Sequence, residues 1–184
     1  MFKKILLVLL TTVLLSPSSP AFSTTHGKTL NSLNSNDIMF AQMMIPHHRQ
    51  AIEMASFALK NSSNQEVKAL AKSISAEQGR EIVQMKYWLR ATKSSMSMGH
   101  GMGHAMDTNG MLTDSQMRNL GKLKITKFDK AFLEAMINHH VGALEMVKLL
   151  KGTKNSEARK LATDIARVQK AEVAAMKKLL AKVA

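Results

Sequence analysis

The chain carries the same sequence pattern twice. With Asp37 placed on Asp129, the first block repeats Phe40 as Phe132, Met44 as Met136, His47-His48 as His139-His140, Ala51 as Ala143, and Glu53-Met54 as Glu145-Met146. A second block, shifted by one residue, repeats Leu70-Ala71 as Leu161-Ala162 and pairs Ile74, Gln78, Glu81 and Met85 with Ile165, Gln169, Glu172 and Met176. The chain is therefore a tandem duplication, and one structural unit must serve both halves.

The first unit has the periodicity of two helices. Apolar and repeated residues recur at steps of three or four over residues 37–58 and again over 67–89, which places each set on one helical face. Ser63-x-x-Glu66 is the pattern of a capping box and predicts the start of the second helix. Pro46 falls inside the first stripe. It either kinks that helix or marks a helix that begins late, and the stripe reaching back to Asp37 favours the kink.

The second unit predicts two further helices. The first of these runs from about Thr126 to Lys151 and is stopped by Gly152, and the second runs from near Asn155 almost to the end. No stretch alternates with the period of a β-strand, so the fold class is all-α. Two antiparallel helix pairs with short internal turns make a four-helix bundle.

The domain organisation follows from these elements. We expect one bundle domain over 35–184, with a first hairpin at 35–91, a linker at 92–125 and a second hairpin at 126–184. Within the linker, Thr113-x-x-Gln116 predicts the cap of a short helix. A linker of this length permits a crossover between the hairpins, so strict up-and-down order is not assured.

The start of the chain predicts export. Residues 1–23 combine Lys3 and Lys4 with an apolar run and then small residues, which is the pattern of a signal peptide. The alternative is an uncleaved membrane anchor, although the apolar run is short for a bilayer span. No later segment is apolar enough to span a membrane, so we expect a periplasmic or secreted protein without a stable anchor after cleavage. The chain has no cysteine, so no disulfide stabilises it.

The charge does not indicate a nucleic-acid-binding protein. The formal net charge is +13, but the lysines are scattered over both halves and aromatic residues make up only 4% of the chain. Aromatic platforms on which bases could stack are therefore missing, and the lysines are better explained as solvated helix faces. The 15 methionines are a stronger signal, because the thioether both fills irregular cores and serves as a soft ligand for Cu(I).

The paired histidines have methionines at helical spacing. Met43 lies four residues before His47, and Met44 lies three before His47 and four before His48. In the second half, Met136 has the same spacing from His139 and His140. These spacings put a thioether and an imidazole on the same face of a helix, one turn apart. The alternative is that the histidines are satisfied core groups, with hydrogen-bond partners such as Asp37, Gln78 and Glu81, and that the methionines only pack.

The linker contains a second group of soft ligands. Methionine and histidine alternate there with glycine, serine and alanine, and this segment has no branched aliphatic residue that could pack into a core; its ligands are Met96, Met98, His100, Met102, His104 and Met106. Several thioethers with an imidazole suit Cu(I) or its mimic Ag(I). A glycine-rich spacer with chance methionines is the alternative explanation.

Enzymatic sites find little support in the sequence. A di-iron bundle needs Glu-x-x-His, but methionine stands three residues before both His47 and His139. Zinc-protease motifs, a nucleophile elbow and a phosphate-binding loop are also missing from the sequence. We therefore predict a protein that is not an enzyme, with a cuprous oxidase kept as a weaker alternative.

The chain resembles the bacterial domain-of-unknown-function family 305. The resemblance lies in Asp37-x-x-Phe40-x-x-x-Met44-Ile45-x-His47-His48-x-x-Ala51-x-Glu53-Met54, followed by Ile74, Gln78, Glu81, Met85 and Trp88-Leu89. It extends over about 35–184, and the second half departs from it at Asn138, Lys178 and Leu179. The resemblance implies a ferritin-like bundle and a role in copper tolerance, with Met44, His47, His48 and their copies as ligands. The linker is less tied to the family, so the ligands predicted there rest on the chemistry of their side chains alone.

Residues and resemblance together predict a copper-binding protein of the cell envelope. It would sequester or hand on Cu(I), and also bind Cu(II) through imidazoles, with another envelope copper-handling protein as a partner. The alternative is a helical interaction module whose methionine-rich surface grips a partner. The predicted metal ligands are Met43, Met44, His47, His48, Met54, Met85, Met96, Met98, His100, Met102, His104, Met106, Met136, His139, His140 and Met146.

Overall fold

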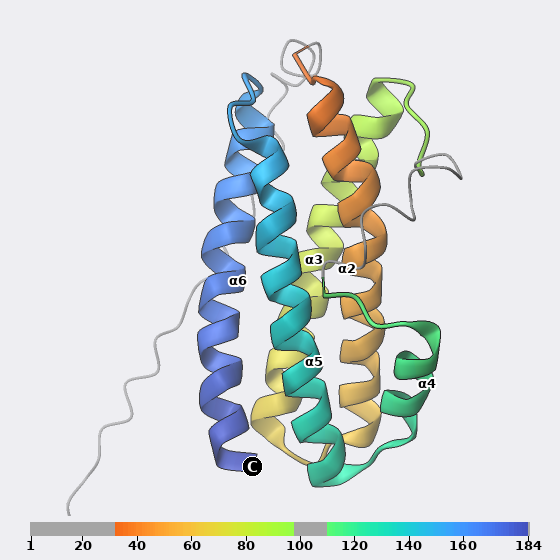
Figure 1. Cartoon of the computed structure of the whole chain (residues 1–184), viewed down its shortest axis with the longest axis vertical. Helices are drawn as coiled ribbons and strands as arrows, with labels where there is room; N and C mark the ends of the chain where they lie inside the picture. The colour runs from red at the N-terminus through yellow and green to blue at the C-terminus, as the bar shows by residue number, and fades with distance from the viewer. Residues whose placement is uncertain (1–31, 98–109, 184) are drawn as a thin grey trace, which may run out of the picture.

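Four long helices form the structure. The computed structural model describes residues 32–97 and 110–183, and within these ranges every regular element is a helix. The long helices are α2 (Ser35–Asn61), α3 (Gln65–Ala91), α5 (Ile125–Met146) and α6 (Ser156–Val183), joined by the short α4 (Asp114–Lys122) and η1 (Val147–Leu150). They stand side by side along the long axis of the molecule (Figure 1). The expectation of an all-α four-helix bundle is confirmed.

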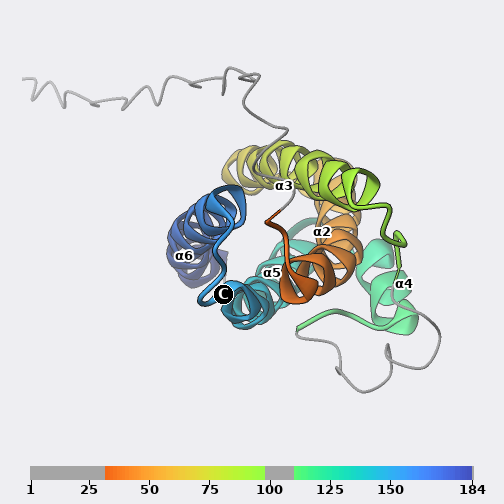
Figure 2. The ribbon, with the colours of Figure 1, turned by 90° about the horizontal axis from the view of Figure 1, so that it is seen from above.

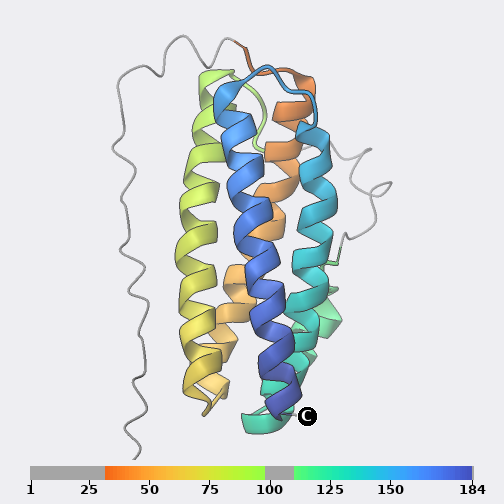
Figure 3. The same ribbon diagram turned by 90° about the vertical axis from the view of Figure 1, so that its left-hand side faces the viewer.

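The two hairpins share one core. Seen from above, the helices surround a common axis in the order α3, α2, α5, α6, and α4 lies outside against α2 and α5 (Figure 2). Each hairpin is antiparallel, and α2 also runs antiparallel to α5 (Figures 1 and 3). Because α3 ends at the end of the bundle opposite the start of α5, the connection between the hairpins is a crossover along the bundle. A crossover between the hairpins is the topology that the length of the linker permits.

The helix starts show which capping predictions were right. The capping box at Thr113 and Gln116 is present at the start of α4 and is confirmed. The box predicted at Ser63 and Glu66 is wrong. The side chain of Asn64 caps α3 instead, because its oxygen accepts hydrogen bonds from the backbone N–H groups of Glu66 and Val67. Asparagine is among the preferred N-cap residues, so the helix begins one residue later.

The second hairpin turns at a glycine with a positive φ. Helix α5 ends at Met146, earlier than predicted, and the chain tightens into the 3₁₀ turn η1 before the turn at Gly152. Gly152 has φ +82°, a conformation that glycine adopts without steric cost. The side chain of Asn155 then caps α6 by accepting a hydrogen bond from the N–H of Ala158.

Pro46 lies well inside α2. The helix begins at Ser35, where Asn34 and Asp37 form a reciprocal capping box, so the alternative of a helix that begins late at Pro46 is wrong. Residues on both sides of Pro46 belong to the same continuous helix. In the described part of the chain, no helix is long and apolar enough to cross a membrane.

The buried apolar residues form two clusters, one toward each end of the bundle. The first cluster, here called the lower cluster, contains Phe128, Phe132 and Leu133 of α5 and is covered by Met117 and Leu120 of α4. The second, called the upper cluster, contains Phe40, Trp88 and Leu89 and reaches α6 through Ala158, Leu161 and Ile165. Along each long helix, a short stretch separates the residues of one cluster from those of the other. The candidate site occupies these stretches.

Candidate metal centre

A buried layer of polar side chains separates the two apolar clusters. Each long helix contributes two residues to it, and the two halves contribute matching residues. The layer consists of His47 and His48 from α2, Gln78 and Glu81 from α3, His139 and His140 from α5, and Gln169 and Glu172 from α6. All four histidines are buried, with no more than 1% of any one exposed. The duplicated sequence therefore folds into one shared centre and not into two separate sites.

Two histidines are held by carboxyl groups. The Nε2 atom of His48 lies 2.6 Å from Oε2 of Glu81, and Nε2 of His140 lies 2.9 Å from Oε2 of Glu172. Each carboxyl group engages Nε2, and Nδ1 of each ring is buried without a partner among the described residues. A second-shell carboxyl group commonly fixes the orientation of a ligating imidazole in this way.

The other two histidines meet each other. The rings of His47 and His139 have centroids 3.7 Å apart and planes inclined by 38°. Neighbouring rings on the same helix, such as those of His47 and His48, are 6.4 Å apart. The pairing therefore joins the two halves across the interface between α2 and α5, which the sequence alone did not show.

Burial favours the uncharged forms of three groups in this layer, His48, His139 and Glu81. Desolvation and then His140 lower the pKa of His48 to about 3, against an opposing effect of Glu172. Desolvation, followed by the nearby histidines, also lowers the pKa of His139 well below 6.5. Desolvation and then Glu77 raise the pKa of Glu81 to about 8. At neutral pH the short contact between His48 and Glu81 is thus a neutral hydrogen bond, although its geometry would also suit an ion pair. Neutral imidazole is the form that binds metals.

Many polar atoms of the layer have no hydrogen-bond partner among the described residues. They are Nδ1 of His48 and His140, both ring nitrogens of His139, Oε1 of Glu172, and both amide atoms of Gln78 and Gln169. Buried polar groups are almost always satisfied, since leaving one unpaired costs about 1–3 kcal/mol. A concentration of such atoms in one layer is the pattern expected where the fold keeps donors ready for a ligand.

The layer is not a conventional cage of hard ligands. In the parts of the chain that the structure describes, no three histidine, aspartate or glutamate side chains are grouped so as to hold a metal ion. The imidazoles instead lie between two groups of thioethers along the bundle. Met44, Met85 and Met146 belong to the upper cluster, and Met54, Met136 and Met176 belong to the lower cluster. Imidazole and thioether are donors that favour Cu(I) over hard cations.

The methionines of α2 lie on the expected stripe but pack at different levels of the bundle. Met54 lies on the buried face of α2 with His47, as predicted, and belongs to the lower cluster with Met136, whereas Met44 belongs to the upper cluster with Met146. Each group thus mixes the two halves, because α2 and α5 are antiparallel. Met176 was missing from the predicted ligands, although its position as the repeat of Met85 could have identified it.

The remaining predicted ligands lie outside the core. Met43 is half-buried beside the upper cluster, and Met96, just beyond α3, is 44% exposed. The other linker ligands, Met98, His100, Met102, His104 and Met106, lie outside the described residues, as do residues 1–23.

Of the three hydrogen-bond partners predicted for the histidines, only Glu81 contacts one among the described residues. Glu81 contacts His48, as the sequence suggested. Asp37 does not take part, since its Oδ2 accepts hydrogen bonds from the N–H of Asn34 and the hydroxyl of Thr153 at the end of the bundle. Gln78 lies in the layer, but both its amide atoms lack a partner within the described chain.

The copper-free protein is expected to be most stable near pH 6.5. Below this pH, unfolded histidines bind protons that folded His48 and His139 do not, so stability falls as the pH falls. Folded Glu81 keeps a proton that the unfolded chain loses above pH 4.5, so its contribution falls as the pH rises toward 8. Between 4.5 and 6.5 the two histidines outweigh the one carboxyl group. Urea unfolding followed by circular dichroism from pH 4 to 9 measures this profile.

Glu81→Gln is the control for the alkaline side of that profile. An amide does not titrate, so the decline between pH 6.5 and 8 should largely disappear in this variant. A parent protein whose stability keeps rising through pH 8 would contradict the assignment of a protonated Glu81.

Sequence comparison identifies a family. The family model described as "Domain of unknown function (DUF305)" matches residues 37–180. No curated protein sequence matches the chain significantly. The family match spans both helical hairpins and every residue of the polar layer.

Structure comparison finds similar bundles. A DUF305 protein from Streptomyces coelicolor, inferred to be secreted, is 30% identical with a TM-score of 0.74, and the match covers 80% of this chain and 92% of that one. CopM in its Cu(II)-bound and Cu(I)-bound forms is 36% and 34% identical, each with a TM-score of 0.66 and coverage of 79% and 96%. A silver-bound form of CopM is 32% identical, with a TM-score of 0.64 and the same coverage.

Proposed function

The chain belongs to the DUF305 family, and on this basis we propose that it is a copper-binding protein that sequesters or transfers Cu(I). The observation that carries the proposal is the buried layer of four histidines between two groups of three methionines. Its thioethers are soft donors, burial favours the neutral forms of His48 and His139, and several ring nitrogens lack a partner in the described chain. Similarity to CopM, whose structure has been solved with Cu(I), Cu(II) and silver, supports the proposal that this chain binds Cu(I).

The core residues have distinct roles in this proposal. The ring nitrogens of His47 and His139, and Nδ1 of His48 and His140, are the donors. Uptake requires the contacting rings of His47 and His139 to turn apart, since their centroids are only 3.7 Å from each other.

The carboxyl groups of Glu81 and Glu172 hold the outer nitrogens of His48 and His140, and so direct these rings inward. When ionised, the same groups balance the charge of a buried cation. The thioethers of the two methionine groups are soft donors on either side of the layer.

The linker supplies a second class of sites in the proposal. Its methionines and histidines are close in sequence and alternate with small residues, so they bind an ion locally and exchange it readily. Cu(II) binds through the imidazoles of this protein, and Ag(I) replaces Cu(I) as a redox-inert mimic. Residues 1–23 direct the chain to the periplasm or the exterior, where methionine remains usable as a ligand without cysteine.

We propose binding without catalysis. Among the described residues, seven methionines are buried, Met39, Met43 and Met111 are half-buried, and Met96 is exposed. A methionine-rich surface for gripping a partner, the alternative function, is thus not formed by the described helices. Transfer to another envelope copper-handling protein remains part of the proposal.

Replacing Met96, Met98, Met102 and Met106 with leucine should reduce the number of Cu(I) ions bound without altering the fold. Leucine removes the thioether donor and leaves the volume of the side chain nearly unchanged. A titration against a Cu(I) chelator of known affinity gives the stoichiometry, with Zn(II) as a control ion and circular dichroism as a check of helicity. If the parent protein binds no Cu(I) in this competition, the copper proposal fails and the partner-binding alternative replaces it.

A further inference from the structure

The end of the linker is fixed against α5 beside the core histidines. Gly110 has φ +81°, and a Cβ atom at this position would lie 2.2 Å from the carbonyl oxygen of Asn138 and 3.0 Å from Cα of His139. A side chain cannot occupy that space, because the contact is made by backbone. The backbone of residue 110 therefore lies directly on the turn of α5 from which His139 projects into the core.

The same segment is also tied to α2. The side chain of Gln50 donates a hydrogen bond to the carbonyl oxygen of Leu112 and accepts one from its N–H group, both at 2.7 Å. A side-chain amide that makes both bonds to one residue fixes the position of that backbone. Residues 110–112, here called the clasp, thus bridge α2 and α5 on the outside of the bundle.

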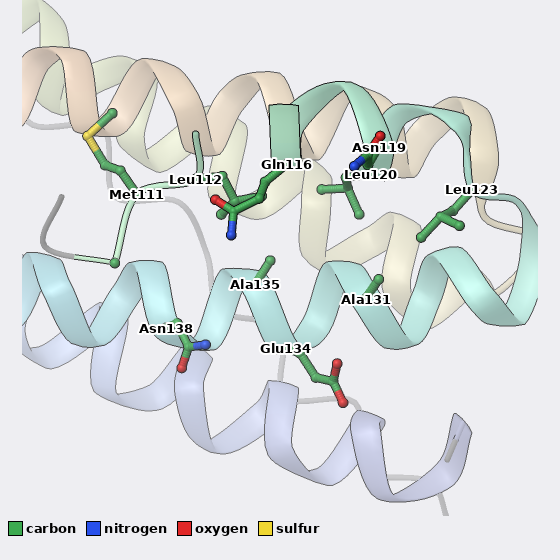
Figure 4. A pocket seen from close by; sticks show the side chains of 11 residues that line it. Met111, Leu112, Gln116, Asn119, Leu120, Leu123, Ala131, Glu134, Ala135 and Asn138 are labelled. Atoms are coloured by element: carbon green, nitrogen blue, oxygen red, sulfur yellow. The ribbon is translucent and has the colours of Figure 1, made fainter. Parts of the chain in front are cut away.

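Met111 lies in the middle of the clasp, between two hollows. On one side it shares a hollow with Pro46, Arg49 and Gln50 of α2, and on the other side a hollow with Asn138 of α5. Figure 4 shows its side chain lying toward α2, with Asn138 on the α5 side. Pro46 and Asn138 immediately precede His47 and His139. The clasp therefore lies on the outside of the turns of α2 and α5 from which His47 and His139 enter the core.

The groups on either side of this position suit metal transfer. Met111 is half-buried and lines two surface hollows, whereas the six methionines of the two groups beside the polar layer are buried. Beneath the clasp, both ring nitrogens of His139 lack a partner among the described residues, and the ring touches that of His47. A soft thioether donor thus lies on the outer side of the helix turns that carry the imidazole donors in the core.

We infer that Met111 is an outer ligand through which Cu(I) or Ag(I) passes between solvent and the pair His47 and His139. The inference rests on the proposed function and adds the route by which the core site fills. Gly110 and Gln50 act as positioning residues, because they hold the clasp on α5 and α2. The step is a ligand exchange, in which a thioether releases the ion to an imidazole without a change of oxidation state.

The test is the rate at which Ag(I) reaches the core of the full chain. Trp88 is the single tryptophan and lies in the upper cluster with Met44 and Met85, so rapid mixing followed by its fluorescence reports core filling. Met111→Leu should slow this phase by about tenfold, the lower end of the effect of losing a group that supports a metal site. Met39→Leu, another half-buried methionine that has no role in the proposal, should keep the parent rate.

Two further variants separate a ligand from a packing residue. Met111→Cys, measured without oxygen, supplies another soft donor and should restore most of the rate lost in Met111→Leu. Gly110→Ala should be as slow as Met111→Leu, because its Cβ would push the clasp off α5. The inference is overturned if Met111→Leu fills at the parent rate, or if Met111→Cys is as slow as Met111→Leu. Failure of the parent to bind Ag(I) at equilibrium would instead overturn the proposed function itself.

Discussion

A variant carrying His47→Leu and His139→Leu is expected to lose Cu(I) binding in the core while its linker sites remain. The two rings are in contact, and together they join the halves of the polar layer. Leucine fills a similar volume with no donor atom. The affinity of the core site should fall by at least about a hundredfold, beyond the range caused by losing a supporting group.

Competition with a Cu(I) chelator separates the two classes of site. The double variant should keep the ions that the linker holds, and the linker variant described above should keep the ions of the core. The two variants thus serve as reciprocal controls. Equal stoichiometry and affinity in the parent and the double histidine variant would show that the core does not bind copper.

The second large effect is expected from replacing Gln78 and Gln169 with leucine. Both amide groups are buried, and none of their atoms has a partner in the described chain. A buried unsatisfied group costs about 1–3 kcal/mol, so the double variant should have a higher free energy of unfolding than the parent without copper. The same variant should bind Cu(I) more weakly, because polar groups that favour a buried cation have been removed.

Urea unfolding measures the expected gain in the free energy of unfolding, and chelator competition measures the expected loss of Cu(I) affinity. Gln84→Leu, at a less buried position of α3, is the control and should change stability by no more than about 0.5 kcal/mol. A double variant less stable than its parent would mean that the two amides make favourable interactions in the folded state. A more stable variant with undiminished affinity would separate the glutamines from copper binding.

The duplication made most of the fold predictable. Residues repeated at helical spacing, such as Phe40 and Phe132, had to face a core, and they are fully buried. The resemblance to a family rested on the same residues and pointed to the same bundle. The topology could not be predicted, because a long linker can return to either end of a hairpin. The crossover between α3 and α5 follows from packing of the whole chain.

The candidate site was only partly predictable for the same reason. Local spacing placed Met44 one turn before His48, and both are in the core. It could not place Met146 beside Met44, or His139 against His47, because these contacts depend on the antiparallel packing of α2 on α5. The clasp was missed because the contact of Gln50 with Leu112 joins residues far apart in sequence.

Ligand-linked stability distinguishes the core from the linker most directly. The linker ligands are close in sequence, so we expect them to bind an ion equally well in the folded and the unfolded chain. Binding there should therefore contribute little to the free energy of unfolding. The core layer exists only in the folded protein, so an ion bound there stabilises the fold. At a free Ag(I) concentration about 100 times the dissociation constant, this stabilisation amounts to about 2.7 kcal/mol.

The decisive measurement is therefore urea unfolding with and without Ag(I) for three proteins. The parent and the linker variant should both be stabilised by about 2.7 kcal/mol under that condition, and the variant with His47→Leu and His139→Leu should not be stabilised. Stabilisation of the double histidine variant equal to that of the parent, or none in the parent, would contradict a copper site at the paired histidines.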